Sequence, residues 1–251
     1  PLPTQGRVMV DLDLLVEEEE IDTSCRALTD AGYEIRPGQG VAAGFQWSAW
    51  RPDRACPIDL HRALGGEVVA RALPVHELLE RTSVREVDGL SYRVLEPADQ
   101  LSHAIVHSEL NDMAHRTGSI ALRQLHNFAQ LYRRIGGGGA WTTAVARLDR
   151  RETRKAVAGH AALQRYLFGL DLPLPRPTFA ARMHLARCLL TYAIPHLSDL
   201  ETNLLLAFDP ATLDAAYPGS SRQAARLRHL VRSFRGGVES VLDSALTARN
   251  R

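Results

Sequence analysis

The feature that most constrains the fold is an apolar run near the N-terminus, RVMVDLDLLV at residues 7–16, which two aspartates interrupt. β-Branched and large apolar side chains dominate this run, so it predicts a mostly buried β-strand. Side chains two residues apart on a strand point to the same face, so we expect Asp11 and Asp13 to project together. Their Cα atoms would lie about 7 Å apart.

A pair of carboxylates in an apolar setting requires a physical explanation. The two groups repel each other and lose hydration. A divalent cation removes both penalties, and oxygen ligands are the ones that Mg²⁺ prefers. An edge strand with one solvated face would also accommodate the pair, without a metal. The strand alone favours neither explanation.

A second short strand offers a third carboxylate. The segment ACPIDLHRAL predicts a strand from Pro57 to His61, which places Asp59 and His61 on one face. If this strand pairs with the first, Asp59 can meet Asp11 and Asp13. The alternative for Asp59 is a lone surface acid. For His61, packing or support of a neighbouring ligand is a more common role than metal binding.

Helical and extended segments alternate between and after these strands. The acidic run at residues 17–20 suits a helix start, and helical spacing continues to about Ala31. Residues 33–37 and 42–51 read as extended segments. The pair Asp88-Gly89 predicts the turn of a β-hairpin within residues 83–95.

The character of the chain changes at about residue 97. Six later segments show apolar residues with a helical period. They are residues 98–113, 120–135, 142–170, 178–194, 200–208 and 221–246. We therefore expect an α+β protein, with a mixed sheet and flanking helices at residues 1–96 and an all-helical domain at residues 97–251.

Two further pairs of residues carry possible ligand chemistry. His103 and His107 are four apart on one helix, a spacing that can bind a metal. A zinc site needs a third ligand, which the neighbouring sequence does not supply, so a buried or interfacial role is favoured. Trp47 and Trp50 offer a stacking surface for a base, although packing in the core or hairpin is more common for such residues.

Charge and cysteine content limit the class of partner. The net charge of +1 gives no bulk attraction to nucleic acid or to an anionic membrane, but it does not exclude nucleic acid bound at a local patch. Cys25, Cys56 and Cys188 show no metal-binding or disulfide spacing, which favours a reduced, cytoplasmic compartment. The sequence shows no signal peptide and no membrane-spanning run.

Taken in order, these motifs resemble the nucleotidyltransferase fold shared with DNA polymerase β and the minimal nucleotidyltransferases. More closely, residues 7–135 resemble a bacterial family of poorly characterised nucleotidyltransferases. The resemblance rests on these elements: Arg7 before the D-x-D-L-L-V strand, Gly32-Tyr33 after the first helix, the Asp59-Leu60-His61 strand, the hairpin, a helix begun by Pro97 and containing His107, and the L-R-x-L segment Leu122–Leu125.

The resemblance implies metal-dependent transfer of a nucleoside monophosphate from a nucleoside triphosphate, typically ATP, to a hydroxyl acceptor. Asp11 and Asp13 would bind one Mg²⁺, and a second Mg²⁺ shared with Asp59 would activate the hydroxyl. It further implies that Arg7 contacts a phosphate or braces the aspartates, and that His61 orients Asp59. The acceptor, base preference and oligomeric state are not readable from the sequence.

Two departures from the family pattern leave other functions open. Members usually carry a helix and a small-residue phosphate loop before the Arg–D-x-D strand, whereas this sequence begins at Pro1. We therefore expect either a fragment or an incomplete site. Asn127 stands where the family commonly has an aspartate. A non-catalytic nucleotide- or partner-binding module on the same fold is the main alternative, and a toxin-like transferase acting on tRNA or protein is another.

Overall fold

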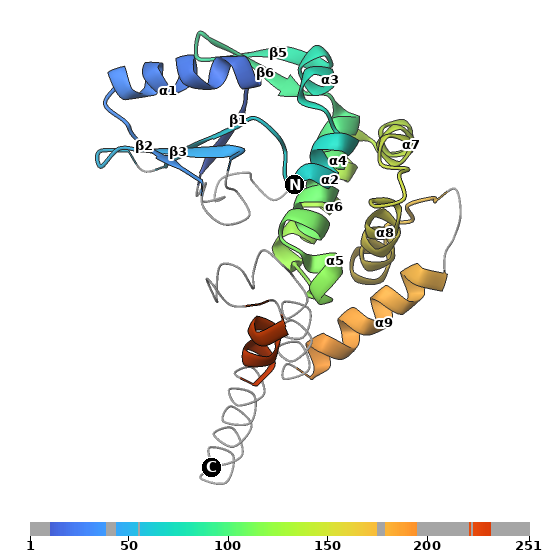
Figure 1. The fold of residues 1–251 in the computed structure, drawn as a ribbon. Helices are drawn as coiled ribbons and strands as arrows, with labels where there is room; N and C mark the ends of the chain where they lie inside the picture. The colour runs from blue at the N-terminus through green and yellow to red at the C-terminus, as the bar shows by residue number, and fades with distance from the viewer. Residues whose placement is uncertain are drawn as a thin grey trace, which may run out of the picture. The chain divides into compact units, whose positions relative to one another are not determined.

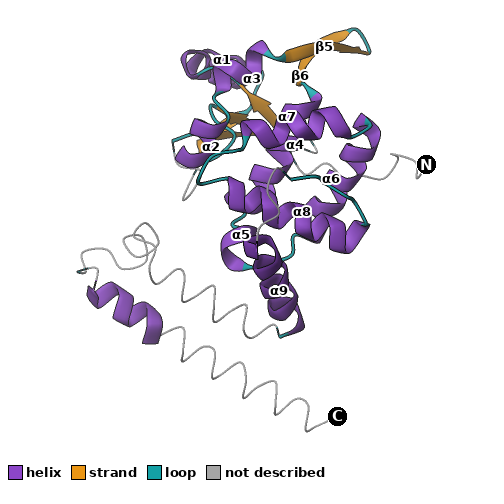
Figure 2. Cartoon of the chain, turned by 90° about the vertical axis from the view of Figure 1, so that its right-hand side faces the viewer, coloured by secondary structure: helices purple, strands orange, loops and turns teal. Residues whose placement is uncertain are grey.

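The computed structural model describes residues 11–38, 44–54, 56–174, 179–194, 221 and 223–231. The described chain is mostly helical, with few strands (Figure 2). It divides into two units, which are treated separately below. One comprises residues 1–111 and 128–157, and the other comprises residues 112–127 and 158–251. Arg7 lies outside the described residues.

A four-stranded mixed sheet forms the first part of the first unit (Figure 1). Its strands are β1 Leu12–Leu15, β2 Glu34–Pro37, β3 Gln46–Trp50 and β4 Ile58–His61, in the spatial order β1-β4-β3-β2. β1 and β4 are parallel, whereas β3 is antiparallel to both β4 and β2. The predicted pairing of the two acid-bearing strands is therefore present in the structure.

The two faces of the sheet differ in chemistry because side chains alternate along each strand. Leu60 of β4 and Ala49 of β3 lie on one face and are buried. Polar residues, including Asp59, occupy the opposite face. The 3₁₀ segment η1 Glu18–Glu20 and helix α1 Ile21–Asp30 follow β1, and α1 contacts β2 (Figure 1).

The predicted hairpin is present as β5 Thr82–Val87 and β6 Leu90–Leu95, which pair antiparallel. Asp88 and Gly89 form its turn with φ values of 51° and 78°. Positive φ at both central residues gives the turn a twist that matches the flanking strands, which explains the preference for an Asp-Gly pair here.

Several helical segments of the first unit have buried residues. They are α2 Glu67–Ala72, α3 Val75–Glu80, α4 Pro97–Val106, the π-helical segment η3 His107–Asn111 and α7 Gly138–Arg147. α4 packs against α7, and the side chains of Leu101, Ile105 and Trp141 on these two helices are fully buried. The chain changes from strands to helices at the predicted domain boundary between residues 96 and 97. The two compact units have other limits, so this domain boundary stays a prediction.

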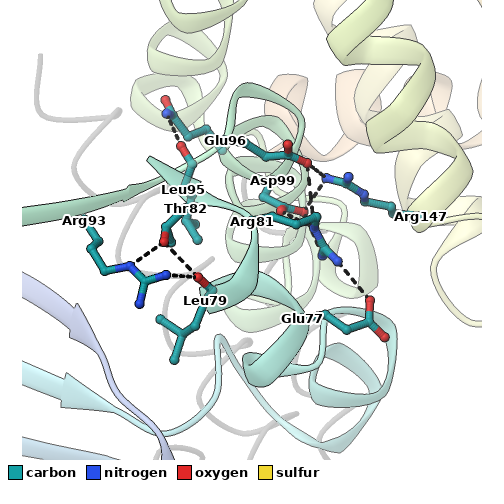
Figure 3. A network of polar contacts seen from close by, with 10 residues as sticks. Glu77, Leu79, Arg81, Thr82, Arg93, Leu95, Glu96, Asp99 and Arg147 are labelled. Atoms are coloured by element: carbon teal, nitrogen blue, oxygen red, sulfur yellow. Dashed lines mark hydrogen bonds and ion pairs between the residues drawn. The ribbon is translucent and has the colours of Figure 1, made fainter. Parts of the chain in front are cut away.

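A buried carboxylate ties three of these helical elements together (Figure 3). Asp99 on α4 is 0% exposed, and it accepts hydrogen bonds from Arg81 Nε at 2.9 Å and from Arg147 Nη1 at 2.8 Å. Arg81 follows α3 and Arg147 ends α7. Because a buried carboxylate needs compensation of its charge, and the two arginines that supply it come from other elements, the network constrains α4.

The second unit is helical in its described part. Its elements include α5 Ala114–Thr117 and α9 Phe179–Ala193. Helix α6 Leu122–Ile135 belongs to this unit as far as Asn127, and helix α8 Arg154–Phe168 from Ala158 onward. Leu125, Leu163 and Cys188 form a buried cluster within it.

The helical predictions are largely confirmed, with one correction. Residues 142–170 were expected to form one helical segment, but α7 ends at Arg147 and α8 begins at Arg154. The buried Thr153 side chain donates a hydrogen bond to the carbonyl of Leu148, and this local bond closes a turn between the two helices. Two predicted helical segments can be checked only in part or not at all. Residues 200–208 lie outside the described residues, and of residues 221–246 the described residues 223–231 are helical.

The expected fold class is confirmed, because a small mixed sheet with flanking helices is followed by further helices. Among the described helices, none combines the length and the apolar character needed to cross a membrane.

Candidate active site

The polar face of the sheet brings two aspartates together from neighbouring strands. In the parallel register of β1 and β4, Asp13 lies directly beside Asp59. Side chains paired in this way project to the same face, and His61 follows on that face two residues after Asp59. The structure therefore places Asp13, Asp59 and His61 together, as their strand positions predicted.

These three residues have the spacing of a metal-binding group. One ligand atom from each side chain, a carboxylate oxygen or an imidazole nitrogen, lies within 4.8 Å of the other two. Two carboxylates and an imidazole form a donor set that fits a divalent cation. Asp11, just before β1, is exposed and is not a member of this group.

His61 contacts Asp13 rather than Asp59. The His61 Nε2 and Asp13 Oδ1 atoms are 2.8 Å apart. Since an ionised carboxylate only accepts hydrogen bonds, Nε2 carries the proton in this contact. We expected His61 to orient Asp59. In the structure, Gln46 and Ser48 of β3 contact Asp59 instead.

Asp59 is held by two side chains from the strand on its other side. Gln46 Nε2 donates to Asp59 Oδ2 at 2.9 Å, and Ser48 Oγ donates to Asp59 Oδ1 at 2.5 Å. Ser48 is the register partner of Asp59, and Gln46 is the register partner of His61. Each carboxylate oxygen keeps a further lone pair for a cation or a proton. These two hydrogen bonds therefore orient the Asp59 carboxylate and leave each of its oxygens able to accept a further contact.

The charge of Asp13 is stabilised by the histidines around it. The hydrogen bond from His61 lowers the pKa of the Asp13 carboxyl, burial opposes this effect, and the nearby His61, His103 and His107 lower the pKa further. Asp13 is consequently ionised at neutral pH, which is the form that binds a cation.

His103 and His107 bring α4 into the electrostatic environment of the site. Their rings meet edge to face, with centroids 5.7 Å apart. Burial, and secondarily the neighbouring His107, lowers the pKa of His103 to about 4, while Asp13 acts in the opposite direction. His103 is half-buried by accessible surface and lies within electrostatic range of Asp13.

Sequence reasoning missed Gln46 and Ser48. Their spacing of two residues matches that of Asp59 and His61, but only the strand register reveals that they face the aspartate. The same register separates Trp47 from Trp50, which are three apart on β3 and so point to opposite faces. They cannot form one stacking surface for a base.

Comparison with known protein families gives a match. The family model described as an uncharacterised nucleotidyltransferase matches residues 3–169, which is more than half of the chain and includes every residue of the site. No curated protein and no solved structure matches the chain.

Proposed function

This chain belongs to the family of uncharacterised nucleotidyltransferases, and from that premise we propose that it moves a nucleoside monophosphate from a nucleoside triphosphate to a hydroxyl acceptor. The observation that carries the proposal is the convergence of Asp13 and Asp59 from parallel strands, with ligand atoms within 4.8 Å. Two acids held together in this way supply the negative charge that a nucleotide-bound cation requires.

Asp13 and Asp59 are the residues that would hold Mg²⁺, and Asp11 is the adjacent carboxylate that would complete a site for two ions. When bound, the ions would neutralise the triphosphate and lower the pKa of the acceptor hydroxyl. Arg7, which lies outside the described residues, would contact a phosphate. ATP is the expected donor, and a small molecule, saccharide, peptide or RNA would each suit as acceptor.

Asp59 is the catalytic residue of this proposal. As the acceptor oxygen forms its bond to the α-phosphorus, the bond from that phosphorus to the pyrophosphate breaks and pyrophosphate leaves. The hydroxyl proton passes to the Asp59 carboxylate, which Gln46 and Ser48 hold in place. His61 lies beside Asp13 in the same site, with its Nε2 atom 2.8 Å from Asp13 Oδ1. We assign the activity to the cytoplasm, because Cys25, Cys56 and Cys188 are reduced thiols that form no disulfide bond.

The test is a search for the transferred group. The full chain is incubated with Mg²⁺, each nucleoside triphosphate and a cell extract, and products are examined by mass spectrometry for an added nucleoside monophosphate. We expect the product with the wild-type protein and with Asp30→Asn, an exposed aspartate at the end of α1. Asp13→Asn and Asp59→Asn should reduce its formation by at least about 100-fold.

Unchanged product formation in either active-site variant would refute the mechanism. Binding of Mg²⁺ and ATP without any product would instead favour the non-catalytic nucleotide-binding module. Product formation that requires intact RNA, and is lost when the RNA has been digested, would identify an RNA acceptor.

A further inference from the structure

We propose that His61 binds the cation directly and that this nitrogen ligand makes the Asp13–Asp59 site favour a first-row transition-metal dication over Mg²⁺. The inference rests on the proposed function and specifies the cation that serves it. It begins from the contact between His61 Nε2 and Asp13 Oδ1, which are 2.8 Å apart. When an ion binds, Nε2 gives up the proton of this hydrogen bond, and the neutral imidazole keeps its proton on Nδ1.

This distance fits two neighbouring ligands of one ion. Adjacent ligands around an octahedral cation with bonds of about 2.1 Å are separated by about 3 Å, and opposite ligands by about 4.2 Å. The Nε2–Oδ1 distance of 2.8 Å matches the first value. The group that also includes Asp59 spans at most 4.8 Å, so small side-chain rotations would bring all three atoms to one ion.

The three side chains are positioned before any ion binds. Asp59 and His61 lie on the same strand and face, and β4 pairs with β1 beside Asp13. Gln46 and Ser48 hold the Asp59 carboxylate. The His61 side chain is 19% exposed, so it has less freedom than a surface histidine. A preorganised imidazole would bind a cation without a large ordering cost.

The donor types decide which cation is preferred. Mg²⁺ dehydrates reluctantly and is bound mainly through oxygen atoms, whereas imidazole is a good ligand for transition-metal dications. With two carboxylates and one imidazole on the protein side, the remaining coordination positions are available to water and triphosphate oxygens. Replacing one oxygen ligand by nitrogen therefore shifts the preference away from Mg²⁺.

The competing role for His61 is to orient Asp13 by hydrogen bonding, with no bond to the cation. The two roles differ in one observable, the coupling between a bound paramagnetic ion and the imidazole nitrogen. Mn²⁺ is a suitable probe because its electron spin reports directly bonded nitrogen. The measurement does not depend on turnover, so it separates this proposal from the proposed activity.

The experiment records pulsed electron paramagnetic resonance spectra of the full chain with Mn²⁺, together with equilibrium dialysis of Mn²⁺ and Mg²⁺. We expect nitrogen coupling in the wild-type protein, its loss in His61→Gln, and its persistence in the controls His103→Gln and His107→Gln. His61→Gln should weaken Mn²⁺ binding by about 10- to 100-fold and change Mg²⁺ binding by less than about threefold.

The possible outcomes distinguish the two proposals. Bound Mn²⁺ without nitrogen coupling, with an unchanged ratio of Mn²⁺ to Mg²⁺ affinity in His61→Gln, would overturn the inference and leave the proposed function intact. Failure of the wild-type protein to bind either ion would count against both. If His61→Gln does not fold, coupling that persists in both control variants still supports His61 as its source, and its loss in either control refutes that assignment.

Discussion

His103 is a residue whose proton binding differs strongly from that of the same group in water. Burial lowers its pKa from 6.5 to about 4, so the folded protein keeps this imidazole neutral across the physiological range. The consequence for stability follows from the difference in protons bound by the folded and unfolded states.

Between pH 6.5 and about 4, the unfolded chain protonates His103 while the folded chain does not. Stability should therefore decrease as the pH falls through this window, by up to about 3 kcal/mol from this residue. Chemical unfolding in a chelating buffer would measure the slope, which we expect to be shallower in His103→Gln than in the wild type. His76→Gln, at an exposed histidine, is the control.

Equal slopes in wild type and His103→Gln would contradict this assignment. Asp13 does not contribute to the pH dependence of stability between pH 6.5 and about 4, because its pKa is lowered from 3.8. The stability gained from an ionised carboxylate with a depressed pKa is present above its unfolded value and is lost only as the pH falls below it.

At this scale, Asp13, Asp59 and His61 could be named as candidates from the sequence, because alternation places Asp59 and His61 on one face of their strand and Asp13 is an acid within an apolar strand. That Asp13 lies directly beside Asp59 depends on the register between β1 and β4. Gln46 and Ser48 could not be named, since their contact with Asp59 depends on the register between β3 and β4. No local pattern encodes that register.

At the scale of elements, a polar contact joins the segment after β4 to the end of η3. Asn111 Nδ2 donates to the carbonyl oxygen of Leu64 at 2.6 Å. Gly65 is buried here, and a Cβ at this position would lie 2.1 Å from Asn111 Oδ1. The absence of a side chain at Gly65 thus permits the contact. It connects the strand of Asp59 to the helix that carries His103 and His107.

Because Gly65→Ala and Asn111→Ala should disrupt the same contact, we expect each to lower the free energy of unfolding by about 1–3 kcal/mol. The double variant should cost little more than the worse single variant. Denaturant unfolding measures all three. Gly66→Ala is the matched control, because a Cβ there meets nothing within 4 Å. Additive effects, or a Gly65→Ala variant as mild as the control, would show that the contact does not join these elements.

Apolar periodicity predicted the positions of α4 and α6 because each has a one-sided apolar pattern. It also predicted α9, although the apolar residues of α9 are spread more evenly around the helix. It could not predict the interruption at Thr153, which depends on a side-chain hydrogen bond to Leu148. It also could not separate the π-helical turn η3 from the α-helix before it. Such turns are frequent at functional sites, where they re-aim side chains.

At the scale of the molecule, the described site lies within one compact unit. Asp13, Asp59, His61 and His103 all belong to the unit formed by residues 1–111 and 128–157. The class of fold followed from the order of strands and helices along the chain. The division into two units did not, because residues 128–157 rejoin the first unit after a segment that belongs to the second.

The central claim is that Asp13 and Asp59 act as one binding site for a nucleotide-bound cation. Isothermal titration calorimetry of the full chain with ATP and Mg²⁺ tests it most directly. We expect binding by the wild type and by Asp30→Asn, and a loss of affinity of at least about tenfold in both Asp13→Asn and Asp59→Asn. An affinity that either of these two substitutions leaves unchanged would contradict the claim.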